Sequence, residues 1–275
     1  MDKKQNELVY ILESNKNEEA SEETLCSSAV VVNLYYEDAL EFYMEYINKI
    51  PLKIDVYVIS SKEVIIQKLK NNESIRKDIH LIRKKNRGRD ISALLVSAKS
   101  ILNQYQYICF VHDKKGKEEY SKEDALNWNL NLWENSIGTE GYIQNLLLKF
   151  EQNPNLGMMV PPKPNGKYLG LYGELLWAGD YKNTVKLAKK LSLECIIERS
   201  IPPLTIGTVF WARTKALKKL FEIEWEYESF PDEPMSDDGE INHAIERILG
   251  YVVRDAGFDV AVAMINTYVE KVTDE

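Results

Sequence analysis

Short apolar runs alternate with stretches of helical spacing through the first 111 residues, and this alternation constrains the fold more than any other feature. The runs at 29–35, 54–59, 79–83 and 107–111 are rich in β-branched residues and almost uninterrupted, which is typical of fully buried strands. Helical spacing over 41–50, 62–71 and 90–104 separates them. Strand, helix, strand order implies parallel, right-handed crossovers. We therefore expect an α/β fold with a mostly parallel central sheet.

The pattern is looser in the second half of the chain. We expect helices around Trp128 and Trp133 and over 141–152, 215–221 and 240–249, strands over 156–160 and 206–212, a long loop over 163–177, and further apolar stretches at 251–253 and 259–262. Residues 13–28 are polar and charged and hold too little apolar surface to pack. Residues 1–27 are therefore interpreted as a leader or linker, and 28–275 as one domain.

Composition excludes several classes of protein. Thirty-five basic against 43 acidic residues give a net charge of −8, which argues against nucleic acid as the main partner. Three cysteines without CxxC spacing do not suit a disulfide framework or a zinc site, and they fit a reducing compartment. No apolar run has the 18 or so residues of a membrane span, and the first residues lack the core of a secretory signal. We expect a cytoplasmic protein. The alternative that this chain is a piece of a longer protein stays open.

Polar clusters follow two of the predicted strands directly. One is His112-Asp113-Lys114-Lys115, and the other is Asn86-Arg87-Gly88-Arg89-Asp90. An open α/β sheet binds ligands beyond the carboxyl ends of its strands, so both clusters are expected at one site. Their cations suit a nucleoside diphosphate, because positive charge in a water-poor cleft stabilises anions strongly. Two alternatives stay open: the lysines form a solvated turn, and Asp90 caps the following helix.

Two further motifs complete a resemblance to a known family. They are Gly207-Thr208-Val209-Phe210-Trp211-Ala212-Arg213 and the segment 238–251, which begins Asp238-Gly239-Glu240. With these four motifs in order, the chain resembles the rhamnan synthesis protein F family and, more distantly, glycosyltransferases of the GT-A fold. The resemblance covers roughly residues 29–268. It implies a GT-A-like, Rossmann-type three-layer sandwich, with a nucleotide-binding half over 28–117 and an acceptor-binding half over 118–275.

The resemblance also implies an activity. It is the transfer of a sugar, typically rhamnose, from a nucleotide-diphosphate donor to a cell-surface polysaccharide precursor, by inverting single displacement. The implied partners are the nucleotide sugar and a glycan or lipid-linked glycan acceptor, with peripheral association at the inner face of the plasma membrane. A noncatalytic glycan-binding or scaffold module is the alternative. An epimerase is disfavoured, because no Gly-x-Gly-x-x-Gly follows the first strand.

The resemblance assigns roles to individual residues. The general base is Asp238 first and Asp237 second, although acidic residues before a helix also complement its dipole. Trp211 stacks on a sugar or belongs to the core, and Glu246 packs against Arg247 or Arg254 or braces the site. The expected donor-binding residues are Asn33, Tyr35, Asn86, Arg87, Gly88, Arg89, Asp90, His112, Asp113, Lys114 and Lys115, and the expected acceptor or sugar pocket holds Gly207, Thr208, Trp211, His243 and Glu246.

The cofactor expectation depends on the residues after the strand at 107–111. GT-A enzymes normally carry Asp-x-Asp there, which holds a divalent cation on the diphosphate, whereas this chain has His112-Asp113-Lys114. Magnesium prefers one or two carboxylates together with phosphate oxygens. We therefore expect either no metal or Mg²⁺ or Mn²⁺ held by Asp113, with Lys114 partly replacing the ion.

Overall fold

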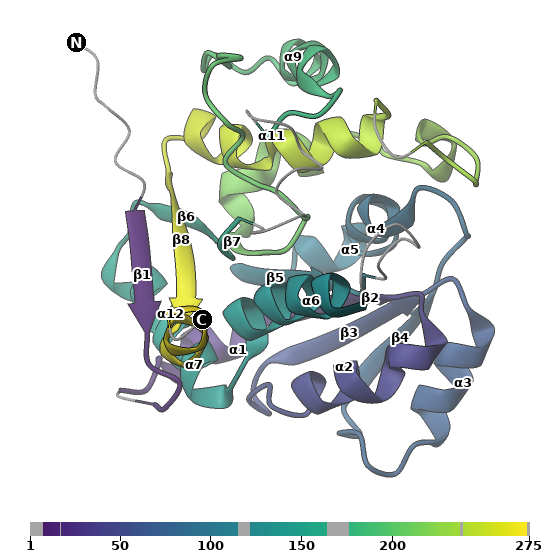
Figure 1. Cartoon of the computed structure of the whole chain (residues 1–275), viewed down its shortest axis with the longest axis vertical. Helices are drawn as coiled ribbons and strands as arrows, with labels where there is room; N and C mark the ends of the chain where they lie inside the picture. The colour runs from purple at the N-terminus through teal and green to yellow at the C-terminus, as the bar shows by residue number, and fades with distance from the viewer. Residues whose placement is uncertain (1–7, 17, 115–121, 164–175, 237–238, 274–275) are drawn as a thin grey trace.

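An eight-stranded sheet runs through the computed structural model, which describes residues 8–16, 18–114, 122–163, 176–236 and 239–273 (Figure 1). The strand order is β1-β8-β6-β7-β5-β2-β3-β4. All neighbours are parallel except β7, which is antiparallel to both β5 and β6. The strands are β1 (Leu8–Leu12), β2 (Ser28–Leu34), β3 (Asp55–Ser60), β4 (Ile79–Arg83), β5 (Tyr107–His112), β6 (Leu156–Val160), β7 (Phe210–Arg213) and β8 (Asp259–Ile265).

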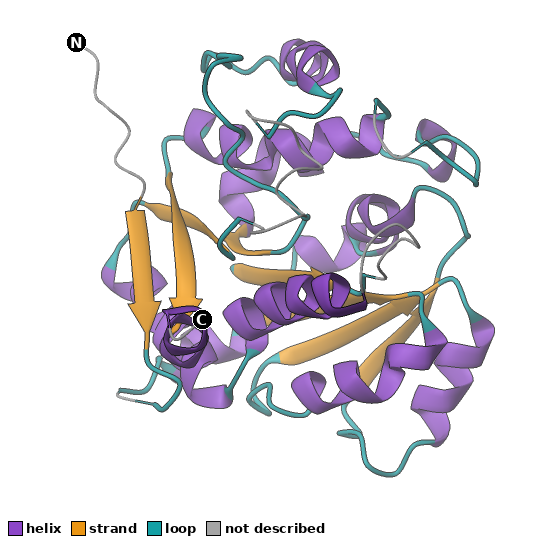
Figure 2. Cartoon of the chain, in the orientation of Figure 1, coloured by secondary structure: helices purple, strands orange, loops and turns teal. Residues whose placement is uncertain are grey.

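Helices cover both faces of the sheet (Figure 2). One face carries α1 (Glu22–Cys26), α2 (Leu40–Ile47), α3 (Glu63–Asn71), α6 (Lys122–Ile137), α7 (Glu140–Gln152) and α12 (Asn266–Thr273). The other carries α4 (Arg89–Ser92), η2 (Ala93–Ser97), α5 (Lys99–Leu102), α9 (Tyr181–Lys190), η3 (Thr214–Leu217), α10 (Lys218–Phe221) and α11 (Ile241–Asp255). Two short 3₁₀ turns, η1 (Glu37–Ala39) and η4 (Tyr227–Ser229), lie in connections.

The central strands are apolar throughout because both of their faces are buried. In β2, Val30 and Val32 pack into the core beneath α2 and α6, whereas Val31 packs into the core beneath η2 and α11. All seven residues of β2 and all six of β5 are buried. The expected fold class is confirmed: the protein is α/β, with a mostly parallel sheet in a Rossmann-like sandwich.

Two elements differ from the sequence expectation. The strand expected over 206–212 begins only at Phe210, because Gly207 and Thr208 adopt left-handed backbone with φ of 95° and 46°. The apolar stretch at 251–253 belongs to α11, which continues to Asp255 and buries these residues against the sheet. A run of three apolar residues cannot by itself distinguish a strand from the end of a buried helix.

The polar N-terminal segment is joined to the sheet, which differs from the leader expected over 1–27. Strand β1 pairs in parallel with β8 at one edge (Figure 1). Beyond it, the Ser14 amide donates to Asn266 Oδ1 at 2.9 Å, and Asn145 Nδ2 on α7 donates to the carbonyls of Glu13 and Asn15 at 3.0 and 2.8 Å. Polar side chains here face solvent while the backbone bonds to α7 and α12, which composition does not reveal.

The described part of the chain contains no helix long and apolar enough to cross a membrane.

Candidate functional site

The loops that follow β2, β4 and β5 meet the segment before β7 and the start of α11 at the carboxyl edge of the parallel strands. Contacts join them in sequence: Asp90 Oδ2 lies 3.8 Å from His112 Nε2, and the same nitrogen lies 2.8 Å from the Gly207 carbonyl. The Gly207 amide donates to Glu246 Oε1 at 2.7 Å. Asn242 Nδ2 donates to the Gly88 carbonyl at 2.7 Å. Four motifs that are far apart in the sequence therefore share one cluster.

His112 lies at the centre of this cluster and is 7% exposed. Its Nδ1 lies 2.9 Å from the Asp113 carbonyl, and its Nε2 faces Gly207. Both partners are carbonyl oxygens, which accept hydrogen bonds. The Asp90 carboxylate lies beside Nε2 at 3.8 Å. His112 therefore connects the end of β5 to the turn before β7.

Asp113 connects the end of β5 to the loop after β2. Its Oδ2 accepts from the backbone amides of Tyr35 and Tyr36, each at 2.7 Å, and its own amide donates to the Asn33 carbonyl at 3.1 Å. Burial raises the pKa of Asp113 to about 6, against the two amides and His112, which lower it. This carboxylate fixes the backbone of the β2 loop.

The loop after β4 is fixed by backbone contacts of its arginines. Arg87 Nε donates to the Phe230 carbonyl at 2.7 Å, and its Nη1 lies 2.8 Å from Asp232. Gly88 has φ of 72°, and a Cβ there would lie 2.7 Å from Phe230 Cγ, so only glycine fits. Arg89 Nη2 donates to the Met235 carbonyl at 2.9 Å while its side chain stays 40% exposed. Arg87 thus anchors the loop, and Arg89 stays partly exposed with its Nε 3.8 Å from Glu233 Oε2.

Two cations from different loops lie near one phenol. Burial and the Asp113 charge raise the pKa of Tyr36, while Arg89 and Lys114 lower it. Lys114 Nζ also lies 5.2 Å from the centre of the Trp128 ring, a cation–π arrangement. The positive groups predicted from the loops after β4 and β5 therefore both act electrostatically on the same side chain.

Other predicted donor residues lie at the rim of the cluster. Tyr35 is half-exposed, with Lys62 Nζ lying 4.5 Å from its ring centre. Asn86 is exposed and accepts a hydrogen bond from Ser61 Oγ at 3.2 Å. Lys115 and both candidate bases, Asp237 and Asp238, lie outside the described residues.

Trp211 belongs to the core. Its side chain is 1% exposed in the layer beneath α6, and its Nε1 donates to the Ser136 carbonyl at 2.9 Å. This burial corrects its expected place in the sugar pocket, because a ring stacked on a sugar needs an accessible face. The other aromatic near Gly207 is Trp128, which lies 3.2 Å from a Cβ placed on that glycine.

Glu246 is the centre of a buried ion network. The network includes Asp180, which the sequence did not single out. Burial would raise the pKa of Glu246, but Arg247, with smaller contributions from Lys114, the Gly207 amide and His243, lowers it to about 2. Arg247 contacts Glu246 through Nη1 and lies 3.9 Å from Asp180 through Nη2. Asp180 in turn accepts from the Gly239 amide at 2.8 Å. The network therefore holds the residue that directly follows Asp238.

Lys84 is a second residue that the sequence did not single out. It directly follows β4, is 6% exposed, and donates from Nζ to the Arg87 carbonyl at 3.3 Å. Burial lowers the pKa of Lys84 to about 8, against Asp90 and Glu233, which raise it. One lysine among 35 basic residues gives no sequence signal of burial, although its place directly after a strand is informative.

The described residues do not fit the divalent metal site of GT-A enzymes. Within the described ranges, no three His, Cys, Asp or Glu side chains are grouped to hold an ion. Asp113 is buried and already accepts two amide hydrogen bonds through Oδ2, which leaves it poorly placed as a ligand. The two ring nitrogens of His112 face carbonyl oxygens.

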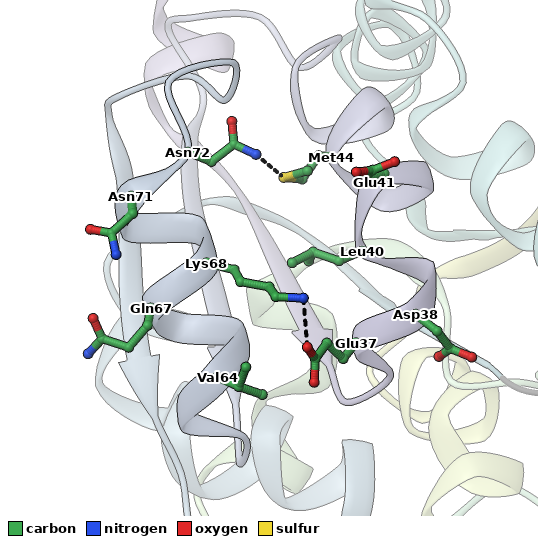
Figure 3. A pocket seen from close by; sticks show the side chains of 10 residues that line it. All are labelled: Glu37, Asp38, Leu40, Glu41, Met44, Val64, Gln67, Lys68, Asn71 and Asn72. Carbon is green, nitrogen blue, oxygen red and sulfur yellow. Dashed lines mark hydrogen bonds and ion pairs between the residues drawn. The ribbon is translucent and has the colours of Figure 1, made fainter.

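A groove of 660 Å³ lies between η1, α2 and α3 (Figure 3). Its lining includes Glu37, Asp38, Glu41 and Lys68, and Lys68 pairs with Glu37 at 2.6 Å across it. None of the predicted site residues lines this groove, so it is separate from the cluster around His112.

The fold and its clustered loops define a Rossmann-like α/β protein whose polar groups gather where such sheets bind ligands. The chain belongs to the rhamnan synthesis protein F family, whose model matches residues 1–258.

The chain is also similar to uncharacterized protein WxcX of Xanthomonas campestris pv. campestris strain B100. The two are 26% identical over 237 residues, which is 84% of this chain and 32% of that protein. The protein of the same name in a second strain of this pathovar gives the same identity and coverage. The chain thus spans about a third of the length of the curated relatives it matches.

Proposed function

We propose that this chain is a glycosyltransferase domain that moves a sugar, with rhamnose as the first candidate, from a nucleotide-diphosphate donor to a polysaccharide precursor. The reaction is an inverting single displacement. Membership in the family supports the polysaccharide product. The observation that supports the enzymatic part is that Arg89 and Lys114, from loops after two different strands, both lower the pKa of the Tyr36 phenol.

The departing diphosphate is the step that these cations serve. Negative charge grows on the leaving oxygen as the glycosidic bond breaks, and positive groups fixed in a partly buried site stabilise it without reorganisation. Arg89 presents a planar set of donors and remains 40% exposed, which suits two phosphate oxygens. Lys114 adds a point charge beside Trp128. In this proposal Lys114 takes over part of the role of a metal.

The acceptor hydroxyl needs a base, and we assign Asp238 first and Asp237 second. The adjoining Gly239 amide is held by Asp180, which supports a fixed position for the end of this acidic segment. Glu246 does not suit this role, because Arg247 and the Gly207 amide hold it as a paired carboxylate with a pKa of about 2. A base near neutral pH works best with a pKa closer to that pH.

The noncatalytic glycan-binding module remains the second candidate. The observation that favours it is the use of the Asp113 carboxylate to hold the amides of Tyr35 and Tyr36, in the place where GT-A enzymes hold a metal. We place either function in the cytoplasm, at the inner face of the plasma membrane. The three cysteines, none of which forms a disulfide, support a reducing compartment.

Donor turnover by the purified chain tests the proposal. Thymidine- and guanosine-diphosphate rhamnose are incubated with the protein, in excess chelator and without it, and release of the nucleoside diphosphate is measured. Asp238→Asn should lower turnover by about 100-fold or more with an unchanged melting temperature, because it removes the base while keeping the size of the side chain.

The matched control is Asp259→Asn, an exposed carboxylate at the start of β8, which should keep full turnover. Near-normal turnover by Asp238→Asn would eliminate this residue as the base. Turnover that stops in chelator would contradict the metal-free role of Lys114. Binding of a glycan by a protein that turns over neither donor would establish the module instead of the enzyme.

A further inference from the structure

Two buried side chains at the cluster have polar atoms with no hydrogen-bond partner. Thr208 is 1% exposed and Asn242 is 4% exposed, and Thr208 Oγ1 and Asn242 Oδ1 contact no donor or acceptor in the described protein. Burying such an atom costs free energy, so native structures contain few of them. Nδ1 of His243, the next residue on α11, is a third buried polar atom without a hydrogen-bond partner. Each is explained if a ligand completes the hydrogen bond.

The orientation of the Asn242 amide is fixed by its other half. Its Nδ2 donates to the Gly88 carbonyl at 2.7 Å, and a carbonyl can only accept. The amide therefore cannot be flipped, and Oδ1 is the atom that has no hydrogen-bond partner. An amide oxygen only accepts, so the missing partner must be a donor such as a hydroxyl.

Thr208 is held in backbone that a β-branched residue rarely adopts. Its φ is 46°, in the left-handed region, and strain of this kind gathers at functional sites. The preceding residue holds the turn in place: the Gly207 carbonyl faces His112 Nε2, and its amide donates to Glu246 Oε1. The fold thus maintains a strained turn that buries a hydroxyl without a protein partner.

The two side chains belong to one cluster of contacts. Asn242 and Glu246 are four residues apart on α11 and share a face of the helix. Glu246 bonds to the residue before Thr208, and Asn242 bonds to the residue before Arg89. The proposed subsite therefore adjoins a cation assigned to the diphosphate.

We propose that Asn242 and Thr208 form a hydroxyl-binding subsite that recognises the sugar ring of the donor and selects among sugars. Asn242 Oδ1 accepts from one ring hydroxyl, and Thr208 Oγ1 donates to or accepts from another. A site built to hydrogen-bond a hydroxyl rejects sugars that lack it, because its own polar atoms then stay unpaired. The inference rests on the proposed function for the identity of the ligand.

The test compares Thr208→Val with Ser136→Ala. Ser136 is also a buried side chain, 1% exposed, whose hydroxyl has no partner, but it lies on α6 away from the cluster. Neither change removes a hydrogen bond within the protein, so neither variant should melt at a lower temperature. Titrations use thymidine and guanosine diphosphate and their rhamnose conjugates. Thr208→Val should lose at least tenfold in affinity for the conjugate and nothing for the nucleotide, while Ser136→Ala keeps both affinities.

Several outcomes would overturn the subsite. One is that the wild-type protein binds the rhamnose conjugate no more tightly than the nucleotide alone. Another is that Thr208→Val keeps the extra affinity that the sugar gives the wild-type protein. Thr208→Ser keeps the hydroxyl and should restore the gain. If Thr208→Val does not fold, Thr208→Ala removes the same hydroxyl and the strain of the β-branch.

The subsite and the proposed function fail in different ways. If the wild-type protein binds neither nucleotide nor conjugate, the proposed donor is overturned. Free L-rhamnose at millimolar concentration then decides about the subsite, by thermal shift. A stabilisation of the wild-type protein and of Ser136→Ala that is absent in Thr208→Val supports it, and no stabilisation of the wild-type protein removes it.

Discussion

Burial is the main cause of the shifted pKa values of two charged side chains at this site, Asp113 and Lys84. Lys84 directly follows β4 and Asp113 directly follows β5, and burial moves the pKa of the acid up to about 6 and that of the base down to about 8. The Asp113 carboxylate bonds to backbone amides of the loop after β2, and the Lys84 amine bonds to a backbone carbonyl of the loop that carries Arg89. Both charged groups therefore serve first to shape loops of the site.

Asp113→Asn tests the raised pKa. The folded protein retains a proton on Asp113 that the unfolded chain releases between about pH 4 and pH 6, so this group's contribution to the free energy of unfolding falls as pH rises through that range. An asparagine has no such dependence. The difference between wild type and variant in urea unfolding should thus decline by on the order of 2 to 3 kcal/mol from pH 4 to pH 6 and then level off.

Asp259→Asn, which changes an exposed carboxylate at the start of β8, is measured in parallel as the comparison variant. A difference between wild type and Asp113→Asn that rises with pH would show a lowered pKa instead, and would contradict the burial argument.

Helix α11 joins most of the site elements to one another. Asn242 bonds to the loop after β4, Glu246 to the turn before β7, and Arg247 to Asp180 at the start of α9. Other residues of the helix, such as Ile245 and Leu249, pack into the core. One rigid element therefore sets the relative positions of loops from both halves of the chain.

Arg247→Met tests whether the ion network on α11 holds the fold. Arg247 is 1% exposed, and removing its charge leaves the carboxylates of Glu246 and Asp180 buried without this cation. Breaking a buried pair in this way should lower the free energy of unfolding by about 3 to 5 kcal/mol, as measured in urea.

Lys218→Met removes one partner of an exposed pair with Glu222 and should cost less than about 1 kcal/mol. A loss in Arg247→Met as small as this would show that the network is dispensable. Adding Glu246→Gln to Arg247→Met should recover part of the stability, because it removes one of the two carboxylates that lose Arg247.

The whole molecule consists of two apolar cores separated by the sheet, and the sheet ends at β1 (Figure 1). This strand exposes Leu8, Val9 and Ile11 and buries Leu12. The following segment places Leu25 of α1 in the core beneath α7. The N-terminal residues thus contribute to the core on one face, despite their polar composition.

Deletion of residues 1–27 tests this contribution. It removes the strand that pairs with β8 and the buried side chains of Leu12, Ala20 and Leu25. We expect a melting temperature lower by about 5 °C or more, measured by calorimetry, since each lost kcal/mol lowers it by roughly 2 to 4 °C at this size. Deletion of 1–7 alone retains every described contact and should have little effect. Equal melting of both truncated proteins would restore the interpretation of a leader.

The sequence by itself determined the α/β class and the strands β2, β3, β4 and β5. β2 and β5 are nearly continuous apolar runs because both of their faces are buried, and such runs are visible locally. It also determined that the Asn86–Asp90 and His112–Lys114 clusters follow strands, which is enough to bring them to one edge. The contact of Asp90 with His112 follows from that placement.

Only the tertiary structure decided which charges are buried and which side chains remain without partners. Lys84, Asp180 and Asn242 look like ordinary surface residues in the sequence, because burial depends on what distant segments place over them. Strand β1 was hidden for the same reason, since its partner β8 lies some 250 residues further along the chain. Local pattern reports which faces are apolar, whereas the pairing of polar atoms depends on the packing of the whole chain.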